Sequence, residues 1–410
     1  MYVQVDVPAC AAYTDTDIDY GNARSLAQKP EVCLGMSARN PWSSCRYQGV
    51  MHDYSVRLLD LGEVPYLRSQ TVYHAVAGAM GDDGPDTIIL MSPREPYACI
   101  GYHQDLEQEI DLHYCTERHL PVLRREIGGG TVYLDCHQLF YHCVFHRRRA
   151  PRRVEDIYRL FLGGPIETYR RLGIRAQLCA LNDIVVEDRK IGGSGAGTIG
   201  EAVVLCGSII FDFDHETMAG LLRTPSPAFK RLVERGLRRN VTSIRGELGH
   251  DWPRDDVRDI LVAQFGETLG VDLIPGELSD KERAEVDRLD AVFLTDSWIH
   301  AVSRPILPAR LIKIRAGVLI CEAATHCDGS SARVALASVD GIIDDVEIVG
   351  DFGFGYSRLD GMERALIGRS LLQDGSVQGV NWPGVEIDGA GLAMVQDCLS
   401  SIEAVARKST

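Results

Sequence analysis

The sequence predicts an α+β fold: a strand-rich mixed sheet with helices at its side, followed by a small C-terminal α+β domain. Short β-prone runs such as 138–146 (QLFYHCVFH) alternate with amphipathic stretches such as 106–119. Pro305 and Pro308 interrupt this pattern, and a new series of strands begins near residue 309. The length of 410 residues suits two or three domains of ordinary size.

Residues 1–50 lack sustained periodicity and predict an irregular N-terminal extension, whereas 51–275 predict the main domain. Gly81 ends a first helix, and a face of Leu106, Ile110 and Tyr114 marks a second. We expect helices at 69–81, 106–119 and 154–173, and strands at 86–93, 97–103, 120–126, 131–135, 138–146, 182–195 (with a polar turn at 187–189) and 201–214.

The second half begins with a helical linker, predicted at 276–308 from the charged stretch at 278–293. The predicted small domain occupies 309–410. Turn signals in CDGSS and DGI separate its strands. We expect strands within 310–326, 332–339 and 343–354, and helices near 360–373 and 390–405.

Composition narrows the class of protein. The net charge of −15 argues against a nucleic-acid binder that relies on phosphate contacts. No apolar run approaches the length of a membrane span, and the first residues make a poor secretory signal, so we expect a cytoplasmic protein without a membrane partner. One basic stretch, 146–153 (HRRRAPRR), is either a solvated loop or a docking patch for an acidic partner.

The twelve cysteines form no C-x-x-C pair. Many lie in apolar runs, which predicts buried free thiols in a reducing compartment. Cys321, His326 and Cys327 could form part of a metal site, but no second pair of ligands accompanies them, so strand-core cysteines are the simpler interpretation.

The stretch 124–135 (RREIGGGTVYLD) is the first candidate for chemistry. Glycines without Cβ atoms let backbone N–H groups approach a ligand closely. With Arg124 and Arg125 just before them, they predict an anion site for phosphate or carboxylate. The alternative is a tight hairpin with surface arginines. Neither a Walker loop nor a dinucleotide fingerprint fits the pattern.

The stretch 181–197 (LNDIVVEDRKIGGSGAG) is the second candidate. Lys190 follows a turn and precedes a segment rich in Gly and Ser, from which its amine could reach into a cleft. Asn182 and Asp183 supply a carbonyl and a carboxylate nearby. For a lysine after a turn, simple solvent exposure is the alternative.

Together the two stretches resemble the lipoate–protein ligase family, whose members pair RRxSGGGxVxHD with NDxxxxGRKxSGSA. Sixty-five residues separate Arg125 from Lys190, which matches the family spacing, and 98–111 (ACIGYHQDLEQEID) resembles the family segment IGxxQNxxxE. The resemblance covers about 55–300. The last hundred residues resemble the accessory domain of bacterial lipoate ligases, fused here to the catalytic part. Such forms also occur beside lipoate-binding proteins of sulfur-oxidising bacteria.

The resemblance implies ATP-dependent attachment of lipoate or octanoate to a lysine of a lipoyl-carrier protein through an acyl-adenylate. It implies that Lys190 bridges the acyl carbonyl and phosphate and that Asp183 orients Lys190 or helps to hold Mg²⁺. The implied contacts with ATP are Arg125, Gly130, Thr131, Val132, Tyr133 and Lys190, and those with the acyl group are Lys190, Ile127, Gly128 and Gly129.

The sequence departs from the family pattern at four positions. Ile127 replaces a serine, Leu134 a histidine, Asp188 a glycine and Gly195 an alanine. Ile127 either reshapes the acyl tunnel, for example in favour of octanoate, or only packs. The preferred acyl chain and the acceptor protein stay open, as does any movement of the accessory domain between steps.

Three other functions remain as alternatives. A biotin–protein ligase would carry a GRGRxGR-type loop, which is absent. An octanoyltransferase would need a cysteine nucleophile rather than ATP, and the candidates Cys206 and Cys179 lie in apolar contexts that disfavour a thiolate. A non-catalytic module that binds lipoyl carriers is the third alternative.

Overall fold

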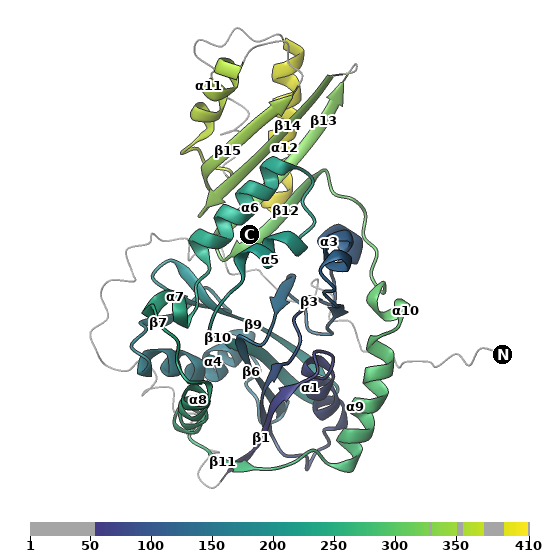
Figure 1. Ribbon diagram of the computed structural model, residues 1–410, viewed down its shortest axis with the longest axis vertical. Coiled ribbons are helices and arrows are strands. Elements are labelled where there is room, and N and C mark those ends of the chain that lie inside the picture. The colour runs from purple at the N-terminus through teal and green to yellow at the C-terminus, as the bar shows by residue number, and fades with distance from the viewer. Residues whose placement is uncertain (1–53, 328–329, 351–355, 373–388, 409–410) are drawn as a thin grey trace, which may run out of the picture.

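The computed structural model describes residues 54–327, 330–350, 356–372 and 389–408, and it consists of a large lobe and a small lobe (Figure 1). The expected N-terminal extension at 1–50, with its three cysteines, lies outside the described residues.

The large lobe is built on an eight-stranded mixed sheet, which confirms the predicted fold class. Its first three strands in the sheet order pair in parallel, whereas the other pairs are antiparallel. In spatial order the strands are β11 (Asp272–Pro275), β1 (Ser55–Val64), β2 (Thr87–Pro93), β6 (Gln138–His146), β10 (Ala202–Ile210), β9 (Arg189–Ile199), β8 (Asp183–Val186) and β7 (Ala176–Cys179).

Helices cover both faces of this sheet (Figure 1). Alternation along β10 shows why two layers form: Val203 and Leu205 pack into the core on one face, and Val204 packs into the core on the other. The first face is covered by α4 (Val154–Arg171) and α8 (Arg254–Leu269), the second by α1 (Arg68–Ala79) and α9 (Asp280–Phe293).

A three-stranded sheet carries the glycine-rich stretch, and its order differs from the expected hairpin. The strand after the glycines, β5 (Val132–Leu134), does not return along β4 (Val122–Arg124). Instead β3 (Tyr97–Ile100) lies between them, parallel to β4 and antiparallel to β5. The helix expected at 106–119 is also divided, because Asp105 and Asp111 each cap a new helix, α2 (Leu106–Glu109) and α3 (Leu112–Glu117).

The stretch from 215 to 248 holds helices that sequence patterning did not identify. They are α5 (His215–Leu221), α6 (Pro227–Asn240) and α7 (Ile244–Leu248), and α10 (Asp296–Ile299) is a further short helix in the linker. Ser226 caps α6 by accepting from the Phe229 amide, and Pro227 occupies its first turn. The apolar face of α6, with Phe229 and Leu232, is fully buried.

The small lobe is an antiparallel four-stranded sheet with helices on both faces (Figure 1). Val334 and Leu336 face α12, whereas Ala335 belongs to the cluster that holds α6. The segment expected as strand at 310–326 is two strands joined by a turn at Ala316–Gly317. The elements are β12 (Ala309–Arg315), β13 (Val318–Cys327), β14 (Ser330–Val339), β15 (Ile342–Gly350), α11 (Tyr356–Leu366) and α12 (Gly389–Ala406).

The packing of α6 bears on domain organisation. This helix precedes the predicted boundary at 309, yet its apolar face packs on the sheet of the small lobe. The boundaries at 275 and 308 therefore stay a prediction. Within the described residues, no helix is both long and apolar enough to cross a membrane.

Candidate active site

The two adjacent arginines of the glycine-rich stretch have different environments. Arg124 is fully buried, and its guanidinium donates to the carbonyls of Gly101, Tyr102, Gln104 and Ile299 at 2.7–3.3 Å. It therefore fixes the backbone around β3 and β4. It also ties this region to α10, whose Trp298 indole donates back to the Arg124 carbonyl.

Arg125 is partly exposed and holds the glycine loop itself. Its Nη2 donates to the carbonyls of Gly128 and Gly130 at 2.9 and 2.8 Å. No carboxylate among the described residues forms an ion pair with it. A guanidinium whose charge is not neutralised thus lies beside an exposed loop, which is the arrangement expected of an anion site.

The glycine loop requires residues without side chains at two positions. Gly129 has φ +97°, a conformation that side chains disfavour. A Cβ on Gly101 would lie 2.1 Å from the Gly129 carbonyl oxygen, so the two segments touch through bare backbone. Gly130, by contrast, faces open space. The loop is therefore packed on one side and accessible on the other.

Gln104 belongs to this site although it was not among the candidate residues. Its Oε1 accepts from the Gly101 amide at 2.9 Å and from the Thr131 hydroxyl at 3.3 Å, and so it links two segments of the loop region. The signal for it was present in the sequence, because Gly101 and Gln104 lie in the upstream stretch that resembles IGxxQNxxxE.

Lys190 on β9 and Asp183 on β8 form a pair between neighbouring strands of the large sheet. Lys190 Nζ lies 2.8 Å from Asp183 Oδ1, and the aspartate is buried while the lysine is about a quarter exposed. The lysine side chain lies over Gly193, where a Cβ would come within 2.8 Å of its Cε. A glycine on β9 therefore leaves room for the amine beside its carboxylate.

The glycine loop and the lysine pair meet on one face of β9. A Cβ on Gly195 would lie 3.2 Å from Ile127 Cγ2 and 3.7 Å from the Gly128 carbonyl oxygen. Because Gly193 and Gly195 are two residues apart in a strand, they share a face. The structure thus brings together the two stretches that sequence analysis singled out, 65 residues apart.

Ile127 is buried between the loop and the sheet. Its Cδ1 occupies the space that a side chain at Gly197 would need, 2.9 Å from the position of that Cβ. It belongs to a core cluster with Tyr73 and Phe140. Two departures from the family pattern, Ile127 and Gly195, are therefore neighbours in space, and the missing methyl at 195 makes room for the larger residue at 127.

Three side chains that could titrate lie in or next to this cluster: Tyr73 and His142 are buried, and Cys206 is partly exposed. Tyr73 stacks on His142 with a ring-centroid distance of 4.5 Å, and Cys206 lies opposite His142 in the β6–β10 register. Burial, with the neighbouring His74, lowers the pKa of His142 to about 3. Burial also raises the pKa of the Cys206 thiol, although Arg125 opposes this. The histidine and the thiol are therefore neutral near pH 7.

The remaining candidates divide into surface and core. Val132 and Thr131 are partly exposed next to the glycines, whereas Tyr133 is buried and packs toward α5 and α6. Asn182 holds β9 through its amide, which donates to the Ser194 carbonyl at 2.8 Å. Cys321 is buried in the small-lobe core, as expected for a strand-core cysteine, whereas Cys327 at the end of β13 is exposed, so that part of the expectation was wrong.

A metal site at Asp183 is not evident from the donor set. Both carboxylate oxygens already accept, Oδ1 from Lys190 and Oδ2 from the Ala316 amide at 2.9 Å. Among the residues that the structure describes, no three or more His, Cys, Asp or Glu side chains are grouped so as to hold an ion. The residues present do not fit a resident Mg²⁺ here.

The basic stretch 146–153 lies at the other end of the sheet from Lys190. His146 pairs with Ala202 and, through β10, with Ile199, nine residues along β9 from the lysine. Most of its charges are engaged in ion pairs: Arg147–Glu201, Arg148–Asp82, Arg149–Asp86 and Arg153–Glu155. This part of the surface is therefore close to neutral.

Comparison with known proteins gives a family for this site. Residues 65–266, which include both stretches, match the family described as the lipoyl protein ligase A/B catalytic domain. This part of the chain belongs to the lipoate–protein ligase family. The resemblance of the two stretches to this family is thereby confirmed, whereas the resemblance of the last hundred residues to an accessory domain stays a prediction.

Curated relatives of this chain include two kinds of enzyme. Octanoyltransferase LipM of Kyrpidia tusciae is 28% identical over 267 residues, covering 59% of this chain and 97% of its own length. Lipoate-protein ligase LplJ of Bacillus subtilis is 24% identical over 312 residues, covering 73% of this chain and 87% of its own length. The family relationship therefore includes both ligases and octanoyltransferases.

Solved structures of the family share the fold. A bi-partite lipoate protein ligase from Thermoplasma acidophilum superimposes with a TM-score of 0.57 at 24% identity, covering 62% of this chain and 99% of its own. Lipoate-protein ligase A bound with ATP gives 0.53 at 23% identity, covering 61% and 100%. At these identities the likeness establishes the fold alone.

Proposed function

We propose that this protein attaches lipoate or octanoate to a lysine of a lipoyl-carrier protein, using ATP and an acyl-adenylate intermediate. The observation that carries the proposal is that the glycine loop, which Arg125 holds, and the Lys190–Asp183 pair lie along one face of β9, with Gly130 of the loop open to solvent. Such a face offers charge and backbone donors to a phosphate beside a positioned amine.

In the first step, a carboxylate oxygen of the acyl acid attacks the α-phosphorus of ATP, and pyrophosphate leaves. Arg125 and the amides around Gly130 hold phosphate oxygens, while Lys190 neutralises charge between the phosphate and the acyl carbonyl. In the second step, the ε-amine of the carrier lysine attacks the acyl carbon, AMP leaves, and the amine proton passes to solvent. Mg²⁺ that accompanies ATP binds mainly to the phosphates.

Two observations favour a ligase over a thiol-dependent transferase. The match to the ligase LplJ covers 73% of this chain, against 59% for the transferase LipM, so the ligase relative accounts for more of the fused chain. In addition, burial raises the pKa of the Cys206 thiol, which disfavours the thiolate that a transferase needs. The solved relative that binds ATP is consistent with this choice.

The transferase stays as the second candidate because of Cys179. Its backbone lies directly opposite Asp183 in the β7–β8 register, so this partly exposed cysteine is close to the lysine pair. If the protein transferred octanoate from a carrier thioester, Cys179 rather than Cys206 would be the expected nucleophile.

Intact-mass measurement on lipoyl-carrier proteins tests the two functions. One set of reactions contains Mg-ATP with free lipoate or octanoate, and another contains an octanoyl thioester on acyl-carrier protein without ATP. We expect a carrier mass gain only in the first set, lost in Lys190→Ala and kept in Cys179→Ala and Cys206→Ala. Mass gain in the second set that disappears in Cys179→Ala would instead establish the transferase.

A further inference from the structure

The second oxygen of Asp183 is held by the small lobe. While Oδ1 contacts Lys190, Oδ2 accepts from the backbone amide of Ala316 at 2.9 Å, across 133 residues of sequence. Ala316 lies in the turn between β12 and β13. We propose that the turn Arg315–Gly317 is a positioning element for Lys190, acting through the Ala316 amide on Asp183. This inference rests on the proposed function of Lys190.

The turn is built to present that amide. Gly317 has φ +80°, and its carbonyl accepts from the Asp340 amide at 2.7 Å, so the turn has a fixed shape. A Cβ on Gly317 would collide with the Asp340 carboxylate. Arg315 Nη1 donates to the Ala316 carbonyl at 2.8 Å and so also fixes the peptide unit between Ala316 and Gly317.

The turn is also anchored to the large lobe next to the lysine. Arg315 Nε donates to the side chain of Asn240, the last residue of α6. Two residues later, the Thr242 amide donates to the Lys190 carbonyl at 2.8 Å. The end of α6, the turn and the start of β9 therefore lie side by side. A shift of the small lobe would act on Lys190 in two ways: through the Ala316 amide on Asp183, and through the end of α6 on the Lys190 backbone.

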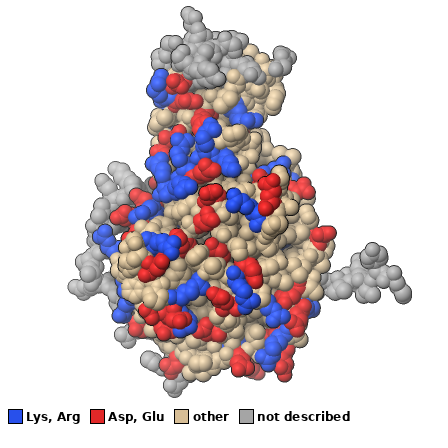
Figure 2. Space-filling model, viewed as in Figure 1, with Lys and Arg blue, Asp and Glu red and all other residues tan. Residues whose placement is uncertain are grey.

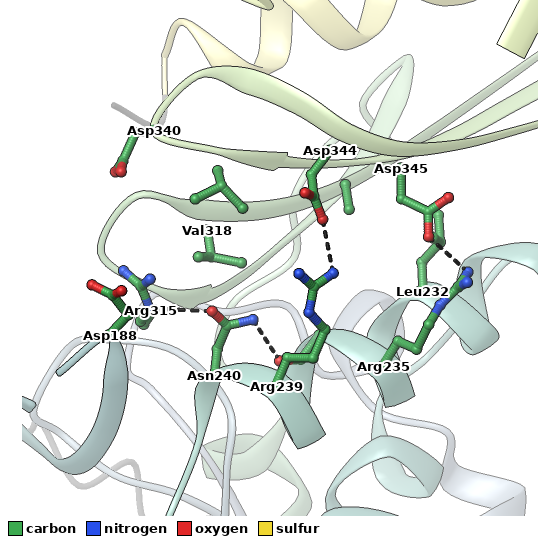
Figure 3. Close-up of a pocket in the computed structure, with 13 residues that line it drawn as sticks. Asp188, Leu232, Arg235, Arg239, Asn240, Arg315, Val318, Asp340, Asp344 and Asp345 are labelled. Atoms are coloured by element: carbon green, nitrogen blue, oxygen red, sulfur yellow. Dashed lines mark hydrogen bonds and ion pairs between the residues drawn. The ribbon is translucent and has the colours of Figure 1, made fainter. Parts of the chain in front are cut away.

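Next to this point, ion pairs across a pocket connect the two lobes. Beside the packed face of α6, a pocket of about 330 Å³ is lined by α6, β14 and β15, and its apolar lining includes Leu232 and Val318 (Figure 3). Arg239–Asp344 at 2.9 Å and Arg235–Asp345 at 3.0 Å span it. Figure 2 shows basic and acidic side chains meeting on the surface where the lobes join. Because Asp183 accepts from Ala316 beside this contact, a change in how the lobes are seated would act on Asp183 directly.

Replacement of the amide donor gives a direct test. Ala316→Pro removes the one N–H that Asp183 uses, and Ala316→Ser is the matched control that keeps it. The first readout needs no enzymatic activity: labelling of Lys190 by an amine-reactive ester, measured by peptide mass spectrometry relative to the exposed Lys230. We expect the Lys190/Lys230 ratio to rise several-fold in Ala316→Pro and to stay unchanged in Ala316→Ser.

The second readout is pyrophosphate release with ATP and octanoate. In Ala316→Pro we expect kcat to fall about 10- to 100-fold, as when a partner that orients a functional group is lost, with the KM of the acid little changed. Equal labelling and equal kcat in the two variants would overturn the proposal. If the wild-type protein released no pyrophosphate, the proposed function would fail, while the labelling contrast would still decide the positioning role.

A charge exchange tests the same idea if Ala316→Pro does not fold. Arg239→Glu, or Asp344→Arg, places like charges across the contact between the lobes. Each single variant should raise the labelling of Lys190 and lower kcat, and the two changes combined should restore both. Labelling that is the same in all three variants as in wild type would contradict the proposal.

Discussion

Lys190 Nζ and Asp183 Oδ1 lie 2.8 Å apart in the large sheet, with the carboxylate buried and the amine partly exposed. The two residues come from neighbouring strands joined by the turn at Glu187–Asp188, and a register irregularity separates them. An ion pair held by two strands has little freedom to rearrange. The amine is therefore oriented before any substrate binds, as electrostatic catalysis requires.

Lys190→Ala should lower the rate of acyl-adenylate formation by about 10²–10³, the usual loss when one preorganised donor is removed. Lys190→Arg keeps the positive charge but spreads it over a planar guanidinium, and we expect it to recover little of the lost rate. The assay is pyrophosphate release in single turnover with Mg-ATP and octanoate. Lys230→Ala, an exposed lysine on α6, is the control and should match wild type.

Replacement of the two neighbouring arginines should have different effects: loss of Arg124 should lower stability, and loss of Arg125 should weaken ATP binding. Arg124→Ala removes the guanidinium that donates to the carbonyls of Tyr102, Gln104 and Ile299 and leaves Gly101 with only the Gln104 amide. We expect the free energy of unfolding in urea to drop by about 3 kcal/mol or more. Arg125→Ala should unfold close to wild type but bind ATP about 10- to 100-fold more weakly, because a charge-assisted contact is lost.

Calorimetric titration with ATP and urea unfolding distinguish these outcomes. Arg125→Lys, which keeps the positive charge, should recover part of the affinity. If Arg124→Ala were as stable as wild type, the buried guanidinium would not have the structural role assigned to it. If Arg125→Ala bound ATP normally, the anion site would have to lie elsewhere.

Ile127 and Gly195 should show coupled effects on stability. Gly195→Ala places a Cβ 3.2 Å from Ile127 Cγ2 and should cost about 1–3 kcal/mol through overpacking. Ile127→Ser leaves a cavity and should cost a similar amount or more. Because the serine makes room for the alanine methyl, the double variant should be more stable than the sum of the single losses predicts, by about 1 kcal/mol.

Urea unfolding of the four proteins measures this coupling, and Gly130→Ala is a matched glycine control whose Cβ would meet open space. Additive losses would mean that the two departures from the family pattern are unrelated. The same variants also test the acyl site: if Ile127 bounds the acyl tunnel, Ile127→Ser should raise kcat/KM for decanoate relative to octanoate.

Much of the large sheet and both functional stretches could be predicted from the sequence. The apolar, β-prone run at 138–146 and the glycines near Arg125 and Lys190 are local patterns that can be recognised without knowledge of tertiary contacts. The strand order around β3 could not be predicted, because β4 pairs with β3 in parallel across a long connection rather than through a hairpin.

Other features depend on contacts that no local pattern reveals. Arg124 and Arg125 are adjacent arginines, yet their side chains point to opposite sides of the backbone. The side chain of Arg124 is buried, and that of Arg125 is partly exposed. The helix α6 was not predicted, because its four arginines and Gly236 make its apolar face hard to recognise in the sequence. The contact between Asp183 and Ala316 joins residues 133 apart and uses a backbone amide, for which the sequence carries no signal.

His142 should make the protein unstable in acid. Its folded-state pKa is lowered to about 3 by burial and by His74, whereas an unfolded histidine titrates near ~6.5. Between these values the unfolded chain binds the extra proton, so stability is full above about pH 6.5 and declines as the pH falls toward 3. By pH 5 the loss from this residue alone is about 2 kcal/mol.

The groups that face His142 make this assignment testable. Tyr73 and His74 come from α1 and Cys206 from β10, and the tyrosine and the thiol are held neutral by burial. His142→Phe keeps an aromatic ring against Tyr73 but cannot be protonated, so the difference between its unfolding free energies at pH 7 and pH 5 should shrink by about 2 kcal/mol. His113→Gln, at an exposed helix position, should leave that difference unchanged. Because the comparison is made within each variant, a general loss of packing in His142→Phe cancels, and an undiminished pH dependence would assign the acid sensitivity to another group.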